Sequence, residues 1–225
     1  MSRPRHVAVI DIGKSNAKVA LVDLAELREI EVRTTPNDVV FGRPFPHHDT
    51  DALWAFIKDA LGRMQRTHGV DAISATTHGA AVMLLDSDGE PILPLLDYEY
   101  DGPDALADEY DTLRPDFASS GSPRLPFGLN LGAQLHWLVR TRPELHSRLE
   151  TVVTYPQYWT GRLTGTWSTE VTLLGCHSDL WLPRERQLSD LVEKLGLGSK
   201  MAPVRSAGDM IGTLLPDVAL ETGLA

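Results

Sequence analysis

The first 35 residues alternate short apolar runs with polar or glycine-containing breaks. The runs are HVAVIDIG over 6–13, AKVALVDL over 17–24 and REIEVRT over 28–34. They are rich in β-branched residues and show partial alternation, which favours strands joined as hairpins. The sequence therefore begins with three predicted antiparallel strands of a sheet.

A helical period follows these strands. The spacing predicts a helix from Asp49 to Thr67, because its apolar positions recur on one face: Leu53, Ile57, Ala60, Leu61 and Met64. Asp49 or Thr50 is suited to cap its beginning, and Gly69 ends it.

Two further apolar segments come after that helix. The strand DAISATTHG covers 71–79 and ends in a polar cluster, and AVMLLD over 81–86 is followed by the turn SDGE and by PILPLLDY over 91–98. The order of three strands, a helix and another strand predicts an α/β fold with a mixed sheet and helices on its faces.

The remainder of the chain reads as mainly helical. Helices are predicted over 101–114, 132–140 and 143–149, and another one ends at Arg162 after the strand TVVTY. Between them FASSGSPRLPFGLN, over 117–130, reads as a long loop, and loops of that length inside a domain are usually functional or disordered.

The net charge of the chain argues against one class of partner, nucleic acids. Lys and Arg number 21 against 31 Asp and Glu, so the formal net charge is 21 − 31 = −10. This acidic balance argues against a nucleic-acid binder, which needs a basic patch to meet phosphates.

Cysteine usage and hydropathy indicate the compartment. Cys176 is the only cysteine, so an internal disulfide and a thiolate-held metal are excluded, and we expect it to be a small buried apolar residue. The apolar run at 7–10 is interrupted by Asp11, so it does not resemble a signal peptide. No apolar run approaches the roughly 18 residues of a membrane span. We therefore expect a cytoplasmic protein without a membrane partner.

The segment DIGKSNAK, between the first two predicted strands, carries candidate chemistry. Its turn can direct backbone N–H groups at a phosphate, with Ser15 and Lys18 as further donors and Asp11 holding a hydrated Mg²⁺. The alternative is a plain hairpin in which Gly13 and Asn16 are needed for positive φ angles.

Six segments, in the same order along the chain, resemble the N-terminal domain of the FGGY carbohydrate kinases, within the actin-like ATPase superfamily. DIGKSNAKVALVD is similar to the first phosphate loop of that family, and ATTHGAAVMLLD and LPLLDYEYDG to its sugar-contacting strands. The others are LPFGLNLGAQLHWL, YPQYWTGRLTGTWSTEVTLLGCHSDLWLP and the connector-like tail GDMIGTLLPDVALETGLA.

The resemblance implies a fold. Residues 1–225 would form the sugar-side domain, with a ribonuclease-H-like core over 1–100 and a mainly helical subdomain over 101–225. The core would hold a five-stranded mixed sheet with helices on both faces. The family's C-terminal, nucleotide-side domain, with its general base and adenine pocket, has no counterpart in 1–225. In the family the general base is an Asp that follows a Gly or a His. Asp209 follows Gly208 in the same way, but it precedes the connector and so comes too early in the chain to be that base.

The resemblance also implies roles for single residues. Asp11 would act through Mg²⁺, and the ATP phosphates would meet the turn residues Gly13, Ser15, Asn16 and Lys18. The sugar would be contacted by Thr77, His78, Tyr98, Glu99 and Asn130.

Each assignment has a plainer alternative. His78 could instead be a histidine whose hydrogen bonds are made within the protein, or one exposed to solvent. Tyr98 could instead cover the edge of the hydrophobic core. Glu99 belongs to an acidic run with Asp97 and Asp101 that solvent alone explains. Asn130 lies between two glycines and suits a turn. The pair His47 and His48 is expected at the surface, since it shows no metal-ligand spacing.

The resemblance implies a function for the complete enzyme. It would transfer phosphate from ATP, with Mg²⁺, to a terminal hydroxyl of a ketose or deoxyketose. The sequences of the matching segments are more similar to rhamnulose and fuculose kinases than to xylulose kinases. This chain would be the sugar-binding half, with negligible turnover by itself. The alternatives are a non-catalytic actin-like module that binds a sugar or a protein, and an actin-like ATPase with a protein partner. Without the second domain, the apolar surface that faces the cleft would be exposed, which would favour a homodimer.

Overall fold

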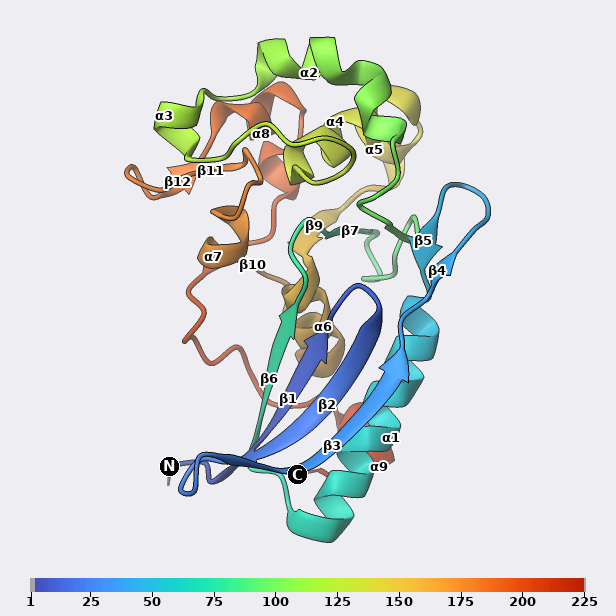
Figure 1. Ribbon diagram of the computed structural model, residues 1–225, viewed down its shortest axis with the longest axis vertical. Coiled ribbons are helices and arrows are strands. Elements are labelled where there is room, and N and C mark those ends of the chain that lie inside the picture. Colours follow the sequence, from blue (N-terminus) through green and yellow to red (C-terminus); the bar gives the residue numbers. More distant parts are fainter. Residues whose placement is uncertain (1–2, 225) are drawn as a thin grey trace.

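A four-stranded mixed sheet forms the lower half of the molecule (Figure 1) in the computed structural model, which describes residues 3–224. Its strand order is β3-β2-β1-β6. Strands β1 (His6–Ile12), β2 (Asn16–Asp23) and β3 (Arg28–Pro36) are antiparallel, and β6 (Ala72–Thr77) runs parallel to β1. The three predicted hairpin strands and the mixed character of the sheet are confirmed.

The fifth strand expected in this sheet is not there among residues 3–224. The chain turns at Gly79 and at Ala80, whose φ is +53°, and so carries the next segment away from β6. That segment forms β7 (Val82–Leu85), which pairs with β9 (Thr151–Thr154) in a separate sheet. A third sheet joins β4 (Val39–Val40), β5 (His47–His48) and β8 (Leu95–Leu96). Strand β6 is therefore an edge strand.

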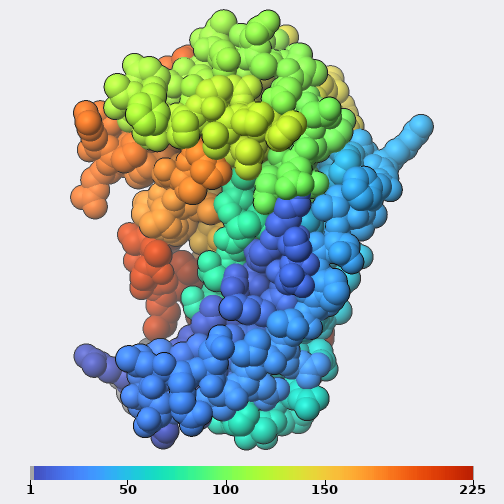
Figure 2. Space-filling model, viewed as in Figure 1, coloured from blue at the N-terminus to red at the C-terminus, as the bar shows by residue number. Residues whose placement is uncertain are grey.

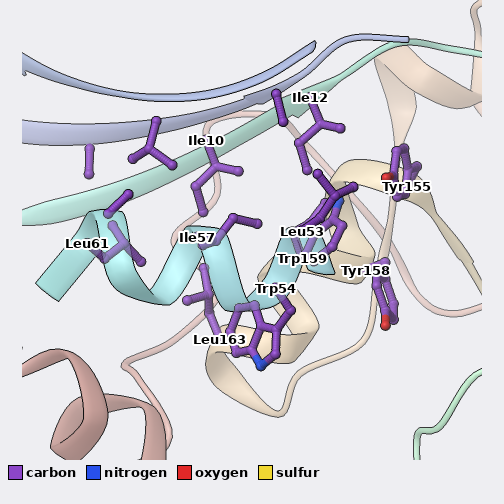
Figure 3. Close-up of a cluster of buried hydrophobic side chains, with 14 of the residues drawn as sticks. Ile10, Ile12, Leu53, Trp54, Ile57, Leu61, Tyr155, Tyr158, Trp159 and Leu163 are labelled. Carbon is purple, nitrogen blue, oxygen red and sulfur yellow. The ribbon is translucent and has the colours of Figure 1, made fainter. Parts of the chain in front are cut away.

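Helices α1 (Thr50–His68), α6 (Tyr155–Thr164) and α9 (Pro216–Thr222) contribute to one hydrophobic core beneath the sheet. Ile10 and Ile12 point from β1 toward these helices (Figure 3), and both are fully buried. The alternate β1 residues Val7, Val9 and Asp11 face the other side and stay partly exposed. Within the described part of the chain no helix covers that side, so the expectation of helices on both faces is wrong.

Helix α1 confirms the helical period read from the sequence. It begins at Thr50, and the Asp49 side chain caps it by accepting hydrogen bonds from the N–H groups of Asp51 (3.1 Å) and Ala52 (2.9 Å). Gly69, with φ of +77°, ends it and donates to the Gln65 carbonyl at 3.1 Å. Seven residues along one side of the helix are buried.

The upper half of the molecule is built from short helices and two-residue strands around a second hydrophobic core (Figure 1). Its helices are η1 (Gly102–Leu106), α2 (Ala107–Leu113), α3 (Phe117–Ser120), α4 (Leu131–Thr141), α5 (Leu145–Arg148), α7 (Val171–Leu174), α8 (Asp190–Lys194) and η2 (Gly198–Lys200). Its short strands are β10 (Thr169–Glu170), β11 (Trp181–Leu182), β12 (Gln187–Leu188) and β13 (Val204–Arg205). Most of the predicted loop over 117–130 is irregular, and α3 occupies its first turn.

Two further sequence expectations concern exposure and the membrane. Cys176 is exposed rather than buried, because Leu174 is the residue at the end of α7 that enters the core. No helix in residues 3–224 has the length and apolar character needed to cross a membrane.

Candidate active site

The turn between β1 and β2 lies at the end of the sheet that faces the upper half of the molecule. The Gly13 N–H donates to the Asn16 carbonyl at 2.9 Å and closes this turn. Neither Gly13 nor Asn16 has a positive φ, so the conformational reason offered for the plain hairpin is wrong. A Cβ atom at Gly13 would lie 3.2 Å from the Asn16 carbonyl oxygen, which is tight, so the turn favours glycine for space.

Asp11 and Lys18 lie side by side at this turn. They are paired across β1 and β2, and Lys18 Nζ is 3.3 Å from Asp11 Oδ2. Both side chains are about two-fifths exposed, at 38% for Asp11 and 42% for Lys18. Ser15 and Asn16 are exposed at the same turn. The predicted phosphate-binding residues are thus gathered at one place, accessible to a ligand.

His78 follows β6 and is joined to the end of β1. Its N–H donates to the Ile12 carbonyl at 2.8 Å, and the Thr77 hydroxyl donates to the His78 carbonyl at 2.7 Å. Two of the five residues expected to contact a sugar, Thr77 and His78, therefore lie directly beside the turn expected to hold a phosphate.

The protonation state of His78 follows from its contacts. Nδ1 lies 2.7 Å from the Gly79 carbonyl, and because a carbonyl only accepts, Nδ1 must carry the hydrogen. Burial lowers the pKa of His78, which keeps the ring neutral at pH 7. Nε2 is then a lone-pair acceptor that is buried and has no hydrogen-bond partner among the described residues. The site thus contains an acceptor suited to a hydroxyl donor.

Two tyrosines pack around the His78 ring. The ring centroids of Tyr98 and Tyr155 each lie 5.3 Å from that of His78. Tyr98 follows β8, and its carbonyl accepts the Gly128 N–H at 2.9 Å, which ties the 117–130 loop to the site. Tyr98 therefore lines the site with His78. Tyr155, the first residue of a family-like segment, was not expected at the site and packs there as well.

Lys14 is another site residue that its sequence context did not single out. It belongs to the β1–β2 turn, but its ammonium reaches the residues after β8. Nζ lies 3.0 Å from Asp97 Oδ1, pairs with Glu99 and stands 4.7 Å from the Tyr98 ring centroid. Glu99 and Asp97 are therefore not only a solvated acidic run, because a cation from the opposite loop holds them.

His48 is buried in the site, with 1% of the residue exposed, so the expected surface position is wrong. Strand β5 places it there by pairing His48 with Leu95 of β8. Its ring centroid is 5.8 Å from that of His78. Burial and the neighbouring His78 lower the pKa of His48 to about 4. The pairing partner lies 47 positions away in the sequence, so no local pattern indicates this placement.

Asn130 has a different role from the expected sugar contact. It is fully buried, and its amide nitrogen donates to the carbonyls of Pro123 (3.0 Å) and His177 (2.8 Å). Its amide oxygen accepts the Leu125 N–H at 2.8 Å. With its amide donors and acceptor engaged inside the protein, Asn130 holds two loops together from an extended position just before α4.

Metal ligands are sparse in this region. No group of three or more His, Cys, Asp or Glu side chains is arranged to hold a metal ion within residues 3–224. The single exposed carboxylate of Asp11 still fits a hydrated Mg²⁺, which is commonly bound by one or two carboxylates together with water and substrate phosphates.

The chain was compared with known proteins. Residues 6–225 match the model described as the FGGY family of carbohydrate kinases, N-terminal domain. A rhamnulokinase from Klebsiella pneumoniae (strain 342) is 31% identical over 193 residues, which cover 79% of this chain and 39% of that protein. An L-fuculokinase from Escherichia coli (strain K12) is 23% identical over 227 residues, covering 97% of this chain and 48% of that protein.

A solved structure gives a closer likeness. The carbohydrate kinase from Novosphingobium aromaticivorans superposes with a TM-score of 0.91 at 38% identity, over all of this chain and 47% of that protein. The chain thus spans about half the length of this protein and of the L-fuculokinase, and somewhat less of the rhamnulokinase.

Proposed function

The chain belongs to the FGGY family of carbohydrate kinases, and from this membership we propose that it is the sugar-binding half of an ATP-dependent kinase. The proposed reaction transfers the terminal phosphoryl group of ATP to a terminal hydroxyl of a ketose or deoxyketose. The rhamnulokinase and L-fuculokinase among its relatives support a deoxyketose of six carbons.

One contact carries the proposal. The 2.8 Å hydrogen bond from His78 N to the Ile12 carbonyl joins the sugar-side residues to the start of the phosphate turn. A kinase needs this proximity, because phosphoryl transfer depends chiefly on positioning the acceptor hydroxyl and on stabilising charge.

The side chains around His78 suit a polyhydroxyl compound. His78 Nε2, Asp97 and Glu99 offer acceptors for hydroxyl hydrogens, and the Tyr98 ring offers an apolar face for the C–H side of a sugar. Thr77 and His78 stand where glycerol kinases, by resemblance, use an Arg-Glu pair, so glycerol is not the proposed substrate.

Asp11 is proposed to hold Mg²⁺ through water at the phosphate turn. The ion would neutralise charge on the phosphates of ATP when bound. Gly13, Ser15, Asn16 and Lys18 would receive the phosphates, and Lys18 also contacts the Asp11 carboxylate at 3.3 Å.

The proton acceptor is proposed to come from the other half of the enzyme. The carboxylates near His78 are already paired, since Asp97 and Glu99 contact Lys14, and Asp11 contacts Lys18. Asp209 lies at the far side of β6, where its carboxylate accepts the Ser206 N–H at 3.1 Å. None of these groups is a free base beside a sugar hydroxyl.

A groove of about 510 Å³ at the free edge of β6 is the proposed contact for that other half. It is lined by β6, by α6 and by the segment 205–214, and Leu224 lies in the same groove. Figure 2 shows this hollow between the red C-terminal segment and the sheet. We propose that a segment following residue 225 adds to β6 there as a parallel strand, since an unpaired edge is a ready template. A strand parallel to β6 would end next to His78.

A panel assay tests the proposed function. ADP release from ATP and Mg²⁺ is measured for the full-length protein with L-rhamnulose, L-fuculose, xylulose and glycerol, and for the 225-residue chain alone. Sugar-dependent release by the full-length protein only, strongest with a deoxyketose, is the expected result. Absence of release with every sugar by the full-length protein overturns the proposal.

A further inference from the structure

Lys14 connects the two substrate regions of the site through a single side chain. Its backbone lies in the phosphate turn, yet its ammonium lies 3.0 Å from Asp97 Oδ1, contacts Glu99 and sits over the Tyr98 ring. Only 20% of the side chain is exposed. A lysine in an exposed turn can leave its ammonium in water, and moving the ammonium into the protein costs free energy unless it is paired. The position of Lys14 therefore depends on its two carboxylate partners.

The charge on Lys14 is maintained in this position. Burial acts to lower the pKa of Lys14, but the adjacent carboxylates of Glu99 and Asp97 outweigh it, and the pKa is raised. The ammonium is therefore a permanent cation between the sugar residues and the phosphate turn.

The two carboxylate partners of Lys14 are unlike each other. Asp97 is 6% exposed, and it also accepts the Glu99 N–H at 3.2 Å, so it is fixed in place. The Glu99 side chain is 61% exposed and is free to exchange partners. Nζ of Lys14 is buried while both carboxylates contact it. An ammonium has three N–H donors, so displacement of Glu99 would open a place for a further acceptor.

Resting on the proposed kinase function, we propose that Lys14 is a substrate-contacting residue that binds the transferred phosphoryl group, and that Glu99 restrains it until a sugar arrives. Sugar hydroxyls donate to the Glu99 carboxylate and draw it away from Lys14. The ammonium, still anchored by Asp97, is then available to the terminal phosphate of ATP. A compact cation at this place stabilises charge on the transferring group.

This arrangement has opposite consequences for the two residues. Loss of Lys14 weakens ATP binding and slows transfer. Loss of the Glu99 charge frees Lys14 without sugar, so ATP binding in the absence of sugar becomes tighter. If the Lys14–Glu99 ion pair were purely structural, loss of Lys14 and loss of the Glu99 charge would change ATP affinity in the same direction, because either change breaks the pair.

The test uses the full-length protein and its Lys14→Met, Glu99→Gln and Lys194→Met variants. Lys194 lies on α8 in a solvent-exposed pair with Asp190, so its variant is the control for loss of one lysine. The dissociation constant of MgATP is measured by calorimetry without sugar, kcat and KM are measured with the best sugar of the panel, and thermal unfolding reports on the fold.

We expect Lys14→Met to weaken MgATP binding by about tenfold and to lower kcat by about 100-fold or more. Glu99→Gln is expected to tighten MgATP binding without sugar by about threefold, and Lys194→Met to match the wild type. A Lys14→Met protein with wild-type MgATP affinity, or a Glu99→Gln protein with weakened affinity, overturns the inference. If no sugar supports turnover in the wild type, the proposed function fails, while the calorimetric comparison still decides the role of Lys14.

Discussion

Nδ1 of His48 lies 3.2 Å from Oδ1 of Asn37, and both residues are buried, at 1% and 4% exposed. The amide orientation is fixed, because Asn37 Nδ2 donates to the Gly13 carbonyl at 2.8 Å. Oδ1 is therefore an acceptor, and His48 Nδ1 must carry the hydrogen. The Asn37 N–H also donates to the Ser15 carbonyl at 3.0 Å. A buried histidine of the sugar side is thus linked through Asn37 to two carbonyls of the phosphate turn, those of Gly13 and Ser15.

The first prediction concerns stability at low pH. Burial holds the pKa of His48 at about 4, below its ordinary value of 6.5, so the folded protein favours the neutral ring. This contribution to stability is complete above pH 6.5 and is lost as the pH falls through 4, by up to about 3 kcal/mol. The groups that act on this ring are His78, Asp97, Lys14 and His47.

Urea unfolding at pH 7.5, 5.5 and 4.5 checks this prediction. The His48→Asn variant keeps a donor toward Asn37 but cannot be protonated in this range, so we expect a smaller loss of unfolding free energy on acidification. His47→Asn is the control, since that ring is only partly buried and bonds the Phe45 carbonyl. Equal pH dependence in the wild type and His48→Asn would contradict the assignment.

The second prediction assigns His78 to the sugar. His78→Ala removes the Nε2 acceptor and is expected to raise KM for the sugar by about tenfold, the value of one hydrogen bond, with KM for ATP nearly unchanged. Steady-state kinetics of the full-length protein measures both constants. His146→Ala, at an exposed position on α5, is the control. An equal rise in both Michaelis constants would indicate general damage to the site.

Local patterns predicted the strands of the hairpins and helix α1, because the interactions that define them lie within a few residues. Asp49 caps α1 through residues 51 and 52, for example. The misassigned residues are determined by distant partners. His48 is buried through pairing with Leu95, and Asn130 is engaged by the His177 carbonyl, 47 positions away. The fifth strand was expected from the family resemblance alone, and the segment that follows β6 pairs with β9 instead, beyond the turn at Ala80.

The third prediction concerns Asp11. Asp11→Asn removes the carboxylate proposed for hydrated Mg²⁺ and is expected to lower kcat of the full-length protein by about 100-fold or more. Sugar affinity, measured by calorimetry, should change little, because His78 and Tyr98 are unaffected. Asp88→Asn, at an exposed turn, is the control. Unchanged turnover in Asp11→Asn would contradict the proposed Mg²⁺ role of Asp11, whereas absence of turnover in the wild type as well would favour the alternative of a non-catalytic binding module.

The fourth prediction tests the close packing of α4 against Tyr110 of α2 and the segment that contains Ser178. A Cβ at Gly132 would lie 2.6 Å from the Tyr110 hydroxyl oxygen and 3.0 Å from the Ser178 carbonyl oxygen. Gly132→Ala is therefore expected to lower the free energy of unfolding by about 1–3 kcal/mol. Gly208→Ala, where no atom lies within 4 Å of the new Cβ, should change it by less than about 0.5 kcal/mol. Urea titrations compare them, and similar midpoints for both variants would refute the packing argument.

The last prediction concerns the free edge of β6. No strand within residues 3–224 pairs with this edge, so we propose that copies of the 225-residue chain associate there. Ser74 is exposed on β6 and lines the groove. A lysine on an edge strand discourages pairing with another chain, so Ser74→Lys is expected to shift the chain toward the monomer in sedimentation velocity experiments. Thr34 is exposed on β3, the strand at the opposite edge, and Thr34→Lys is the matched control. If Thr34→Lys rather than Ser74→Lys disperses the assembly, association runs through β3. In that case the β6 groove loses its support as the place where the second half of the enzyme docks.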